Sequence, residues 1–379
     1  MINDFVKKSI KAYLNYRSFK TNRQLILIES DDWGSIRTQN IKTLNKLNDI
    51  SRAVKQDPYI QLDSIASSND LSALFEILNS VRDSKGNPAC ITANVCTANP
   101  DFNAIKASNF NEFHYEIFTQ TLDRYSNTEN LFDLWKNAEK EKLFYPQLHG
   151  REHVHAPAWL AELRAGNKDL LKAFELNSFG IPYNGILSQK RKNFQAALDS
   201  YNTKSEELHQ KKWIKDSVDI FKNTFGYYSK SFIAPAYIWH NDLHIDLYNS
   251  NVKSLQGIKL QYEPNNLFKN NYKRKLHYTG EIDKTGLLYT TRNTFFEPAS
   301  IPQKDWVSST LKGVEKAFQN KQPAIIGSHR INYIGSLNPD NRSKNLIMLK
   351  TILQKLVKDY RNVEFINSAD LADLISEKF

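Results

Sequence analysis

Three groups of ionisable residues stand just after apolar runs in this 379-residue sequence. They are the adjacent pair Asp31 and Asp32, the pair His149 and His153, and the single residue His329. Two neighbouring carboxylates repel each other unless a cation or a shared proton offsets their charge. One carboxylate and two imidazoles can hold a divalent metal with a position open to water, which is a common hydrolytic arrangement. The residue types therefore predict a metal-dependent hydrolase with additional acid–base groups.

The loop that carries the histidine pair offers one more ligand. It reads His149-Gly-Arg151-Glu-His153-Val-His155, so that His155 competes with His153 for the role of second imidazole. A pair of histidines four residues apart arises easily by chance. What favours a metal site is the position of the loop directly after a predicted strand, because the ends of parallel strands gather chemistry. The residues alone leave the choice between His153 and His155 open.

The apolar runs predict strands that are buried on both faces. Residues 25–28 are four consecutive apolar residues, and comparable runs occupy 143–148 and 323–328. Helical periodicity separates them, for example at 38–50 and 69–82. Strands that alternate with helices favour an α/β fold with a mostly parallel barrel of seven or eight strands. In such a barrel the carboxyl ends of the strands share one face, where the candidate residues would meet.

Length and composition favour one large domain. A hydrophobic fraction of 40% suffices for a sizeable core, and we expect a single domain over 1–379 with a mainly helical insertion at about 157–225. No apolar run approaches the length of a membrane span. The first twenty residues lack the pattern of a secretory signal, which predicts a cytoplasmic protein. Cys90 and Cys96 are expected to be buried thiols and not metal ligands.

The formal charge of +10 predicts attraction to anionic partners. The alternatives are a soluble basic surface, a phosphate-bearing substrate and an anionic membrane surface. No nucleic-acid motif accompanies the charge, so nucleic acid is not an expected partner. Residues 4–19 predict a helix that either packs on the domain or lies on a membrane surface. The oligomeric state cannot be predicted.

The order of these motifs resembles the polysaccharide deacetylases of carbohydrate esterase family four. The resemblance rests on an apolar strand into Asp31-Asp32-x-Gly, on His149-x-x-x-His153, and on a strand ending in Ser-His329. It covers about residues 25–376. It implies a distorted (β/α) barrel that hydrolyses N-acetyl or O-acetyl groups on sugars with a bound divalent metal, commonly zinc.

The resemblance also implies a role for each residue. Asp31 would be the general base, and Asp32 would bind the metal together with His149 and His153. His329 would be the general acid. These roles agree with the chemistry, because a departing amine must be protonated by an acid that lies opposite the base. Zinc suits such ligands best, although cobalt, nickel or iron would also fit them.

The sequence departs from the family pattern in one motif. Where the family carries Arg-x-Pro, this chain has Ile233-Ala-Pro235, so the arginine that orients the base aspartate is missing. Arg151, Arg292 or Arg330 would have to replace it. Together with the insertion, this departure suggests a divergent, larger branch of the family.

Further residues near the predicted strand ends are candidates for substrate contact, with ordinary packing as the alternative for each. The candidates are Trp33, Arg151, His155, Tyr237, Trp239, Glu297 and Arg330. The favoured function is removal of an acetyl group from an N-acetylated sugar or glycan precursor, with a carbohydrate substrate that is phosphate- or lipid-linked. The alternatives are hydrolysis of another amide or of a glycosidic bond on the same barrel, and a non-catalytic carbohydrate-binding or assembly protein that retains the metal site.

Overall fold

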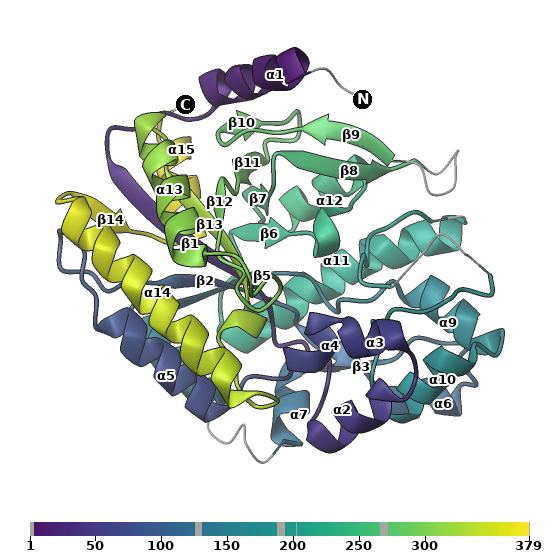
Figure 1. The fold of residues 1–379 in the computed structure, drawn as a ribbon. Helices are drawn as coiled ribbons and strands as arrows, with labels where there is room; N and C mark the ends of the chain where they lie inside the picture. Colours follow the sequence, from purple (N-terminus) through teal and green to yellow (C-terminus); the bar gives the residue numbers. More distant parts are fainter. Residues whose placement is uncertain (1–3, 126–130, 188–193, 202, 266–271, 379) are drawn as a thin grey trace.

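A mostly parallel sheet with helices packed around it forms the centre of the molecule (Figure 1). The computed structural model describes residues 4–125, 131–187, 194–201, 203–265 and 272–378. Within these ranges the main sheet has ten strands. They are β1 (Gln24–Trp33), β2 (Ile91–Val95), β5 (Phe144–Leu148), β6 (Ser231–Ile233), β7 (Ser254–Gly257), β10 (Glu281–Ile282), β11 (Leu288–Thr291), β12 (Thr294–Phe295), β13 (Ala324–His329) and β14 (Val363–Phe365).

The pairing of these strands confirms the α/β class and the parallel sheet. The order is β10-β11-β7-β6-β5-β2-β1-β13-β12, with β14 also on β1, and only β10 and β11 pair antiparallel. The expected seven or eight strands become ten because β10 and β12 have two residues each. Strands that short leave no periodic pattern in a sequence.

One short segment links the two ends of the sheet. The backbone N–H of Arg292 donates to Gly257 at the end of β7, and the N–H of Asn293 donates to Ile325 in β13. The chain therefore passes from pairing with β7, through β11, to pairing with β13, through β12. This link curls the sheet round and places Arg292 between strands that are far apart in the sheet order.

Residues 25–28 of strand β1 are all apolar because both faces of the strand are covered. Ile26 and Ile28 belong to the largest hydrophobic cluster, whereas Leu25 and Leu27 belong to a separate cluster with residues of α15 (Ser368–Ser376). Alternate residues of a strand point to opposite faces. Burial of each such side chain is worth roughly 1.5–3 kcal/mol, so the run 25–28 holds the strand firmly in place.

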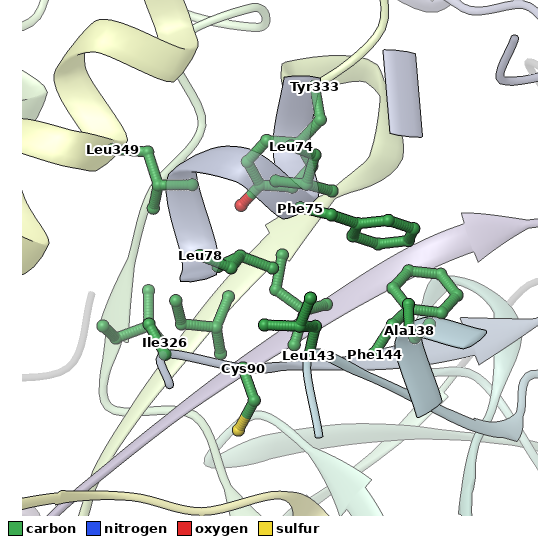
Figure 2. Close-up of a cluster of buried hydrophobic side chains, with 14 of the residues drawn as sticks. Leu74, Phe75, Leu78, Cys90, Ala138, Leu143, Phe144, Ile326, Tyr333 and Leu349 are labelled. Atoms are coloured by element: carbon green, nitrogen blue, oxygen red, sulfur yellow. The ribbon is translucent and has the colours of Figure 1, made fainter. Parts of the chain in front are cut away.

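Four helices cover the outer face of β1 and its neighbours. Figure 2 shows Leu74, Phe75 and Leu78 close to strand residues such as Phe144 and Ile326. Helix α5 begins with a capping box between Ser67 and Asp70, which satisfies two backbone donors that would otherwise lack partners. The four helices are α5 (Ser68–Asn79), α8 (Leu131–Lys140), α13 (Trp306–Gln319) and α14 (Pro339–Asp359).

The predicted insertion lies between β5 and β6 and is helical in three parts. These are α9 (Ala156–Arg164), α10 (Lys168–Glu175) and α11 (Lys204–Phe225). Within the insertion, the sequence pattern of residues 191–210 predicts a helix. This prediction is wrong for residues 194–201, which are irregular, since the helix begins at Lys204; residues 191–193 and 202 lie outside the described residues. The insertion shares a hydrophobic cluster with α2 (Ile41–Asn48), α3 (Arg52–Gln56) and α4 (Pro58–Leu62).

The remaining elements are short, and several of them were not predicted. The sequence pattern of residues 231–237 predicts a strand, but the strand ends at Ile233 and the chain continues as a turn of 3-10 helix, Pro235–Tyr237. Two hairpins were missed, β3–β4 and β8–β9. The other elements are α1 (Asp4–Arg17), β3 (Ala98–Pro100), α6 (Phe102–Ala107), β4 (Tyr115–Ile117), α7 (Phe118–Asp123), α12 (His244–Asn249), β8 (Leu260–Pro264), β9 (Tyr272–Leu276) and the 3-10 turns Asn241–Leu243 and Arg330–Asn332.

Helix α1 lies at one edge of the molecule (Figure 1). Its Leu14 is buried, while Tyr13 and Tyr16 are exposed, and Phe19 after the helix donates its backbone N–H to Thr279. Contact of α1 with a membrane surface stays a prediction. Among the described residues, no helix has the length and apolar character that crossing a bilayer requires.

Candidate metal and acid–base site

The ends of three strands bring the predicted residues together. Asp31 in β1 pairs in register with His329 in β13. His149 follows β5, which is separated from β1 only by β2. His153 lies four residues further along the same loop and returns to the same place, since its Nε2 is 3.5 Å from Oδ1 of Asp32. Residues separated by up to 298 positions therefore share one site (329 minus 31).

The two adjacent aspartates face different partners because the backbone changes conformation between them. Asp32 has φ 72°, in the left-handed region, which is uncommon for a residue with a side chain and is typical of functional sites. The pairing of β1 with β2 shifts register between Ser30 and Trp33, and such a bulge re-aims a side chain. Gly34 completes the turn: its φ is 82°, and a Cβ there would lie 2.4 Å from the carbonyl oxygen of Cys96.

Asp32, His149 and His153 form a buried group whose ligand atoms lie within 4.8 Å of one another. Nε2 of His149 is 3.4 Å from Oδ1 of Asp32. Tetrahedral zinc with bonds of about 2.0–2.1 Å separates its ligand atoms by roughly 3.3 Å. The spacing in this site therefore matches what a small divalent cation needs.

Potential metal-ligand atoms of this group make no hydrogen bonds to the described residues. Oδ1 of Asp32 and Nε2 of His149 are buried and have no hydrogen-bond partner among the described residues, and such atoms need an explanation in a folded protein. Nδ1 of His149 lies 2.9 Å from the carbonyl oxygen of Ile233, which holds the proton on Nδ1 and leaves the Nε2 lone pair for a metal. Nδ1 of His153 has no such partner. The donor set fits a divalent metal.

The charge states of these groups also suit metal binding. Burial lowers the pKa of His153 to about 3, so its ring is neutral. Although burial alone would raise the pKa of Asp32, the charge of the Arg37 guanidinium keeps it well below its usual value. A neutral imidazole and an ionised carboxylate are the forms that bind metals.

Asp31 is held on the other side by Arg292. Nη1 and Nη2 of Arg292 donate to the two carboxylate oxygens at 2.7 and 2.6 Å, and Asn94 donates to Oδ1 at 2.7 Å. Burial would raise the pKa of Asp31, but the charge and hydrogen bonds of Arg292 lower it to about 2. Of the three arginines considered for the missing motif arginine, Arg292 is the one that contacts Asp31.

A glycine in the next strand makes room for Arg292. A Cβ at Gly327 would lie 2.6 Å from Cδ of Arg292, so any larger residue would displace that side chain. The same guanidinium donates from Nε to Glu29 at 2.9 Å and from Nη1 to the hydroxyl of Tyr237 at 2.9 Å. Contacts on several sides therefore fix the position of Arg292, and Arg292 in turn orients Asp31.

His329 lies beside Asp31 and is more exposed than Asp32, His149 and His153. Its Nε2 is 3.7 Å from Oδ2 of Asp31, and its side chain is 24% exposed. Its Nδ1 lies 2.7 Å from Glu297, and Asn332 donates to the other oxygen of Glu297 at 2.9 Å. Burial lowers the pKa of His329, but Glu297 overcomes this and raises it to about 9. At neutral pH the ring is therefore protonated and can act as an acid.

Several of the predicted substrate contacts are structural instead. The bulge in β1 turns Trp33 into the core, where its side chain is 1% exposed. Trp33 packs edge-on against Trp135 and Phe144, and its Nε1 donates a hydrogen bond to Ser30. Trp239 is buried and donates to His244. Both side chains were candidates for substrate contact with core packing as the alternative, and their burial favours packing.

Three further candidates for substrate contact, two arginines and one histidine, make contacts within the protein instead. Arg151 is paired with Glu152 and Asp216. His155 caps α9, because its Nδ1 accepts the N–H of Ala158, and its Nε2 lies 3.2 Å from the carbonyl oxygen of Ser200. The group that could hold a metal contains His153. Arg330 is fully buried against Asp63. Tyr237 and Glu297 do lie at the site, where they contact Arg292 and His329.

Four further residues surround the site, and none of them was a candidate from the sequence. Arg37 contacts Asp32, Asp63 contacts Arg37, Asn94 contacts Asp31, and the ring of Tyr59 packs edge-on against His329 with centroids 5.7 Å apart. Only Asn94 carried a signal, as a polar residue within a predicted buried strand. The other three lie in irregular segments or short helices where polar residues are ordinary.

Comparisons with known proteins give distant structural matches. No family model and no curated protein matches this chain. Among solved structures, a putative glycoside hydrolase/deacetylase from Parabacteroides distasonis is 9% identical, with a TM-score of 0.48 over 95% of this chain and 73% of that one. A putative polysaccharide deacetylase from Mycobacterium smegmatis is 10% identical, with a TM-score of 0.43 over 95% and 93%. The 4-alpha-glucanotransferase from Thermococcus litoralis is 7% identical, with a TM-score of 0.43 over 95% of this chain and 41% of that one. Function is therefore inferred from the residues of this chain.

Proposed function

We propose that this protein is a metal-dependent hydrolase of the polysaccharide deacetylase type, a divergent member that removes an acetyl group from an N-acetylated sugar or glycan precursor. One observation carries the proposal. Unpartnered ligand atoms of Asp32 and His149 meet His153 on one side of the site, and a carboxylate with a protonated imidazole lies on the other side, at Asp31 and His329.

The metal is proposed to be zinc, held by Asp32, His149 and His153. When bound, such a cation lowers the pKa of a water molecule towards neutrality and polarises the carbonyl oxygen of the acetyl group. The chain supplies three protein ligands, which is the number found in catalytic zinc sites that keep one position open.

Asp31 would receive the proton of the attacking water. Arg292 and Asn94 point its carboxylate and keep it ionised over the whole neutral range. A carboxylate with so low a pKa is a weak base, so it can serve only if the water is already acidified and its proton is transferred over a short path.

His329 would protonate the departing amine. An amine is a poor leaving group unless it gains a proton, and an imidazolium with a pKa of about 9 is charged at neutral pH. Glu297 holds the ring at Nδ1, so that Nε2 faces Asp31. The formal charge of +10 further favours a substrate that carries phosphate, such as a nucleotide- or lipid-linked sugar.

Acetate release by the Asp31→Asn variant tests this proposal. The zinc-loaded native protein and the variant are compared on a panel of N-acetylated sugars, sugar nucleotides and lipid-linked sugars. We expect release by the native protein and a loss of about 10²- to 10⁴-fold in the variant, with the metal content unchanged. Equal, negligible release from both proteins over the whole panel would contradict the proposal and favour a binding protein.

A further inference from the structure

A chain of four buried charges leads away from the proposed metal ligand Asp32. Nη2 of Arg37 donates to Oδ2 of Asp32 at 3.2 Å, and Nε of Arg37 lies 3.3 Å from Oδ2 of Asp63. Arg330 then donates to both oxygens of Asp63, in each case at 2.9 Å. The four side chains are at most 2% exposed. Negative and positive side chains therefore alternate along this series, and none of the four is exposed to water.

Stability alone is a poor reason for such an arrangement. Removing four charges from water is costly, and well-packed apolar residues often give equal or greater stability than a buried ion-pair network. The groups do hold a defined geometry, because the planar guanidinium of Arg37 meets two carboxylates from different segments at once. A fixed geometry beside a metal ligand indicates a positioning function.

Arg37 determines which oxygen of Asp32 is available. It occupies Oδ2, while Oδ1 faces His149 and His153 and has no hydrogen-bond partner among the described residues. The backbone of Asp32 is in the uncommon left-handed region, so the side chain needs a contact that secures its direction. With Oδ2 engaged, the carboxylate presents a single, directed donor atom to the cation.

The last residue of this series of charges, Arg330, lies just after β13, the strand that carries the proposed acid. Arg330 directly follows His329, and it also donates to the backbone carbonyl of Ser35, in the turn after Asp32. Asp63 lies just after α4 and binds both arginines. The ends of β1 and β13 are therefore tied together by charges as well as by strand pairing.

We infer that Arg37 is a positioning residue for the metal: it holds Asp32 as a single-oxygen ligand, and Asp63 and Arg330 hold Arg37. The inference rests on the proposed metal site and deepens it. Loss of a hydrogen-bonded partner of a metal ligand typically weakens metal affinity about 10- to 100-fold, which sets the size of the expected effect.

The test is the zinc affinity of Arg37→Lys, measured by competition with a chromophoric chelator after the protein has been stripped of metal. Lysine keeps the positive charge but is shorter and carries its donors on one nitrogen, so it cannot reproduce the fixed geometry in which Nη2 of Arg37 contacts Asp32 and Nε contacts Asp63. We expect zinc to bind about 10- to 100-fold more weakly. The matched control is Arg342→Lys, which alters an arginine–aspartate pair with Asp70 outside the site and should leave the affinity unchanged.

The outcomes separate this inference from the proposed function. A native chain that binds no zinc would overturn the metal site itself. A native chain that binds zinc, with Arg37→Lys within about twofold of it, would overturn only the role of Arg37. If Arg37→Lys does not fold, a crystal structure of the native protein with zinc decides: coordination through Oδ1 alone, with Oδ2 still on Arg37, is expected, and two-oxygen coordination with Arg37 displaced contradicts the inference.

Discussion

At the scale of single residues, the site depends on the different surroundings of Asp31 and Asp32. The left-handed backbone of Asp32 directs one carboxylate towards the histidines and leaves the other beside Arg292. Each carboxylate is offset by its own arginine, Arg292 for Asp31 and Arg37 for Asp32. Without these cations, two buried carboxylates side by side would share a proton. Both can therefore remain ionised, one as the proposed ligand and one as the proposed base.

The alkaline limit of activity should depend on Glu297. Its carboxylate raises the pKa of His329 to about 9, so the acid form is present below that pH and is lost as the pH rises through it. In Glu297→Gln the shape is kept and the charge is removed, so the pKa of His329 should fall towards its ordinary 6.5. We expect the alkaline limb of the kcat/KM profile to move down by at least one pH unit.

The control for this prediction is Glu364→Gln, which removes a carboxylate paired with Arg23 and Lys85 away from the site. Its profile should match that of the native protein. The free energy of unfolding of the native protein should fall over the same pH range. The stabilisation that protonated His329 provides is fully present below about pH 6.5 and disappears as the pH rises through about 9. An alkaline limb that is identical in the native protein and in Glu297→Gln would rule out His329 as the acid.

At the scale of elements, the strand ends were the predictable part of the site. Asp32, His149 and His329 could be found because each follows a run of apolar residues that must be a buried strand, and strand ends meet on one face. Arg292 could be named only as one of three arginines, since its position depends on the two-residue link between β11 and β12. Arg37 and Asp63 lie in segments without periodicity, so no pattern distinguishes them from surface charges. For Trp33 the sequence left substrate contact and core packing open, because the register shift in β1 between Ser30 and Trp33 leaves no mark in the residue pattern.

The lack of a side chain at Gly327 in β13 should be essential for the position of Arg292. In Gly327→Ala the new methyl group would collide with Cδ of Arg292 and with the ring of Phe295. Such overpacking costs about 1–3 kcal/mol of unfolding free energy, measurable by urea denaturation. The displaced guanidinium would also release Asp31, so acetate release should fall by at least tenfold while zinc affinity is kept.

A second glycine provides a matched control for this strand substitution. Gly257 lies at the end of β7, and nothing lies within 4 Å of a Cβ added there. Gly257→Ala should therefore leave both the free energy of unfolding and the activity close to native values. If Gly327→Ala behaves like Gly257→Ala, Arg292 does not depend on the space beside β13.

At the scale of the whole molecule, the proposed ligands come from widely separated parts of the chain. Asp32 lies in the first strand, and the two histidines follow β5, more than a hundred residues later. The ligand atoms of Asp32, His149 and His153 meet only in the folded protein. A cation that binds them therefore binds the native state and not the unfolded chain. Metal at 100 times its dissociation constant would then add about 2.7 kcal/mol to the free energy of unfolding.

The metal content of the purified protein is the most direct test of the site. Elemental analysis should find about one divalent ion per chain, retained in Asp31→Asn and lost in Asp32→Ala and His149→Ala, and zinc should raise the melting temperature of the stripped native protein but not of the last two variants. A native protein that purifies without metal, and that takes up no zinc when it is supplied, would contradict the account.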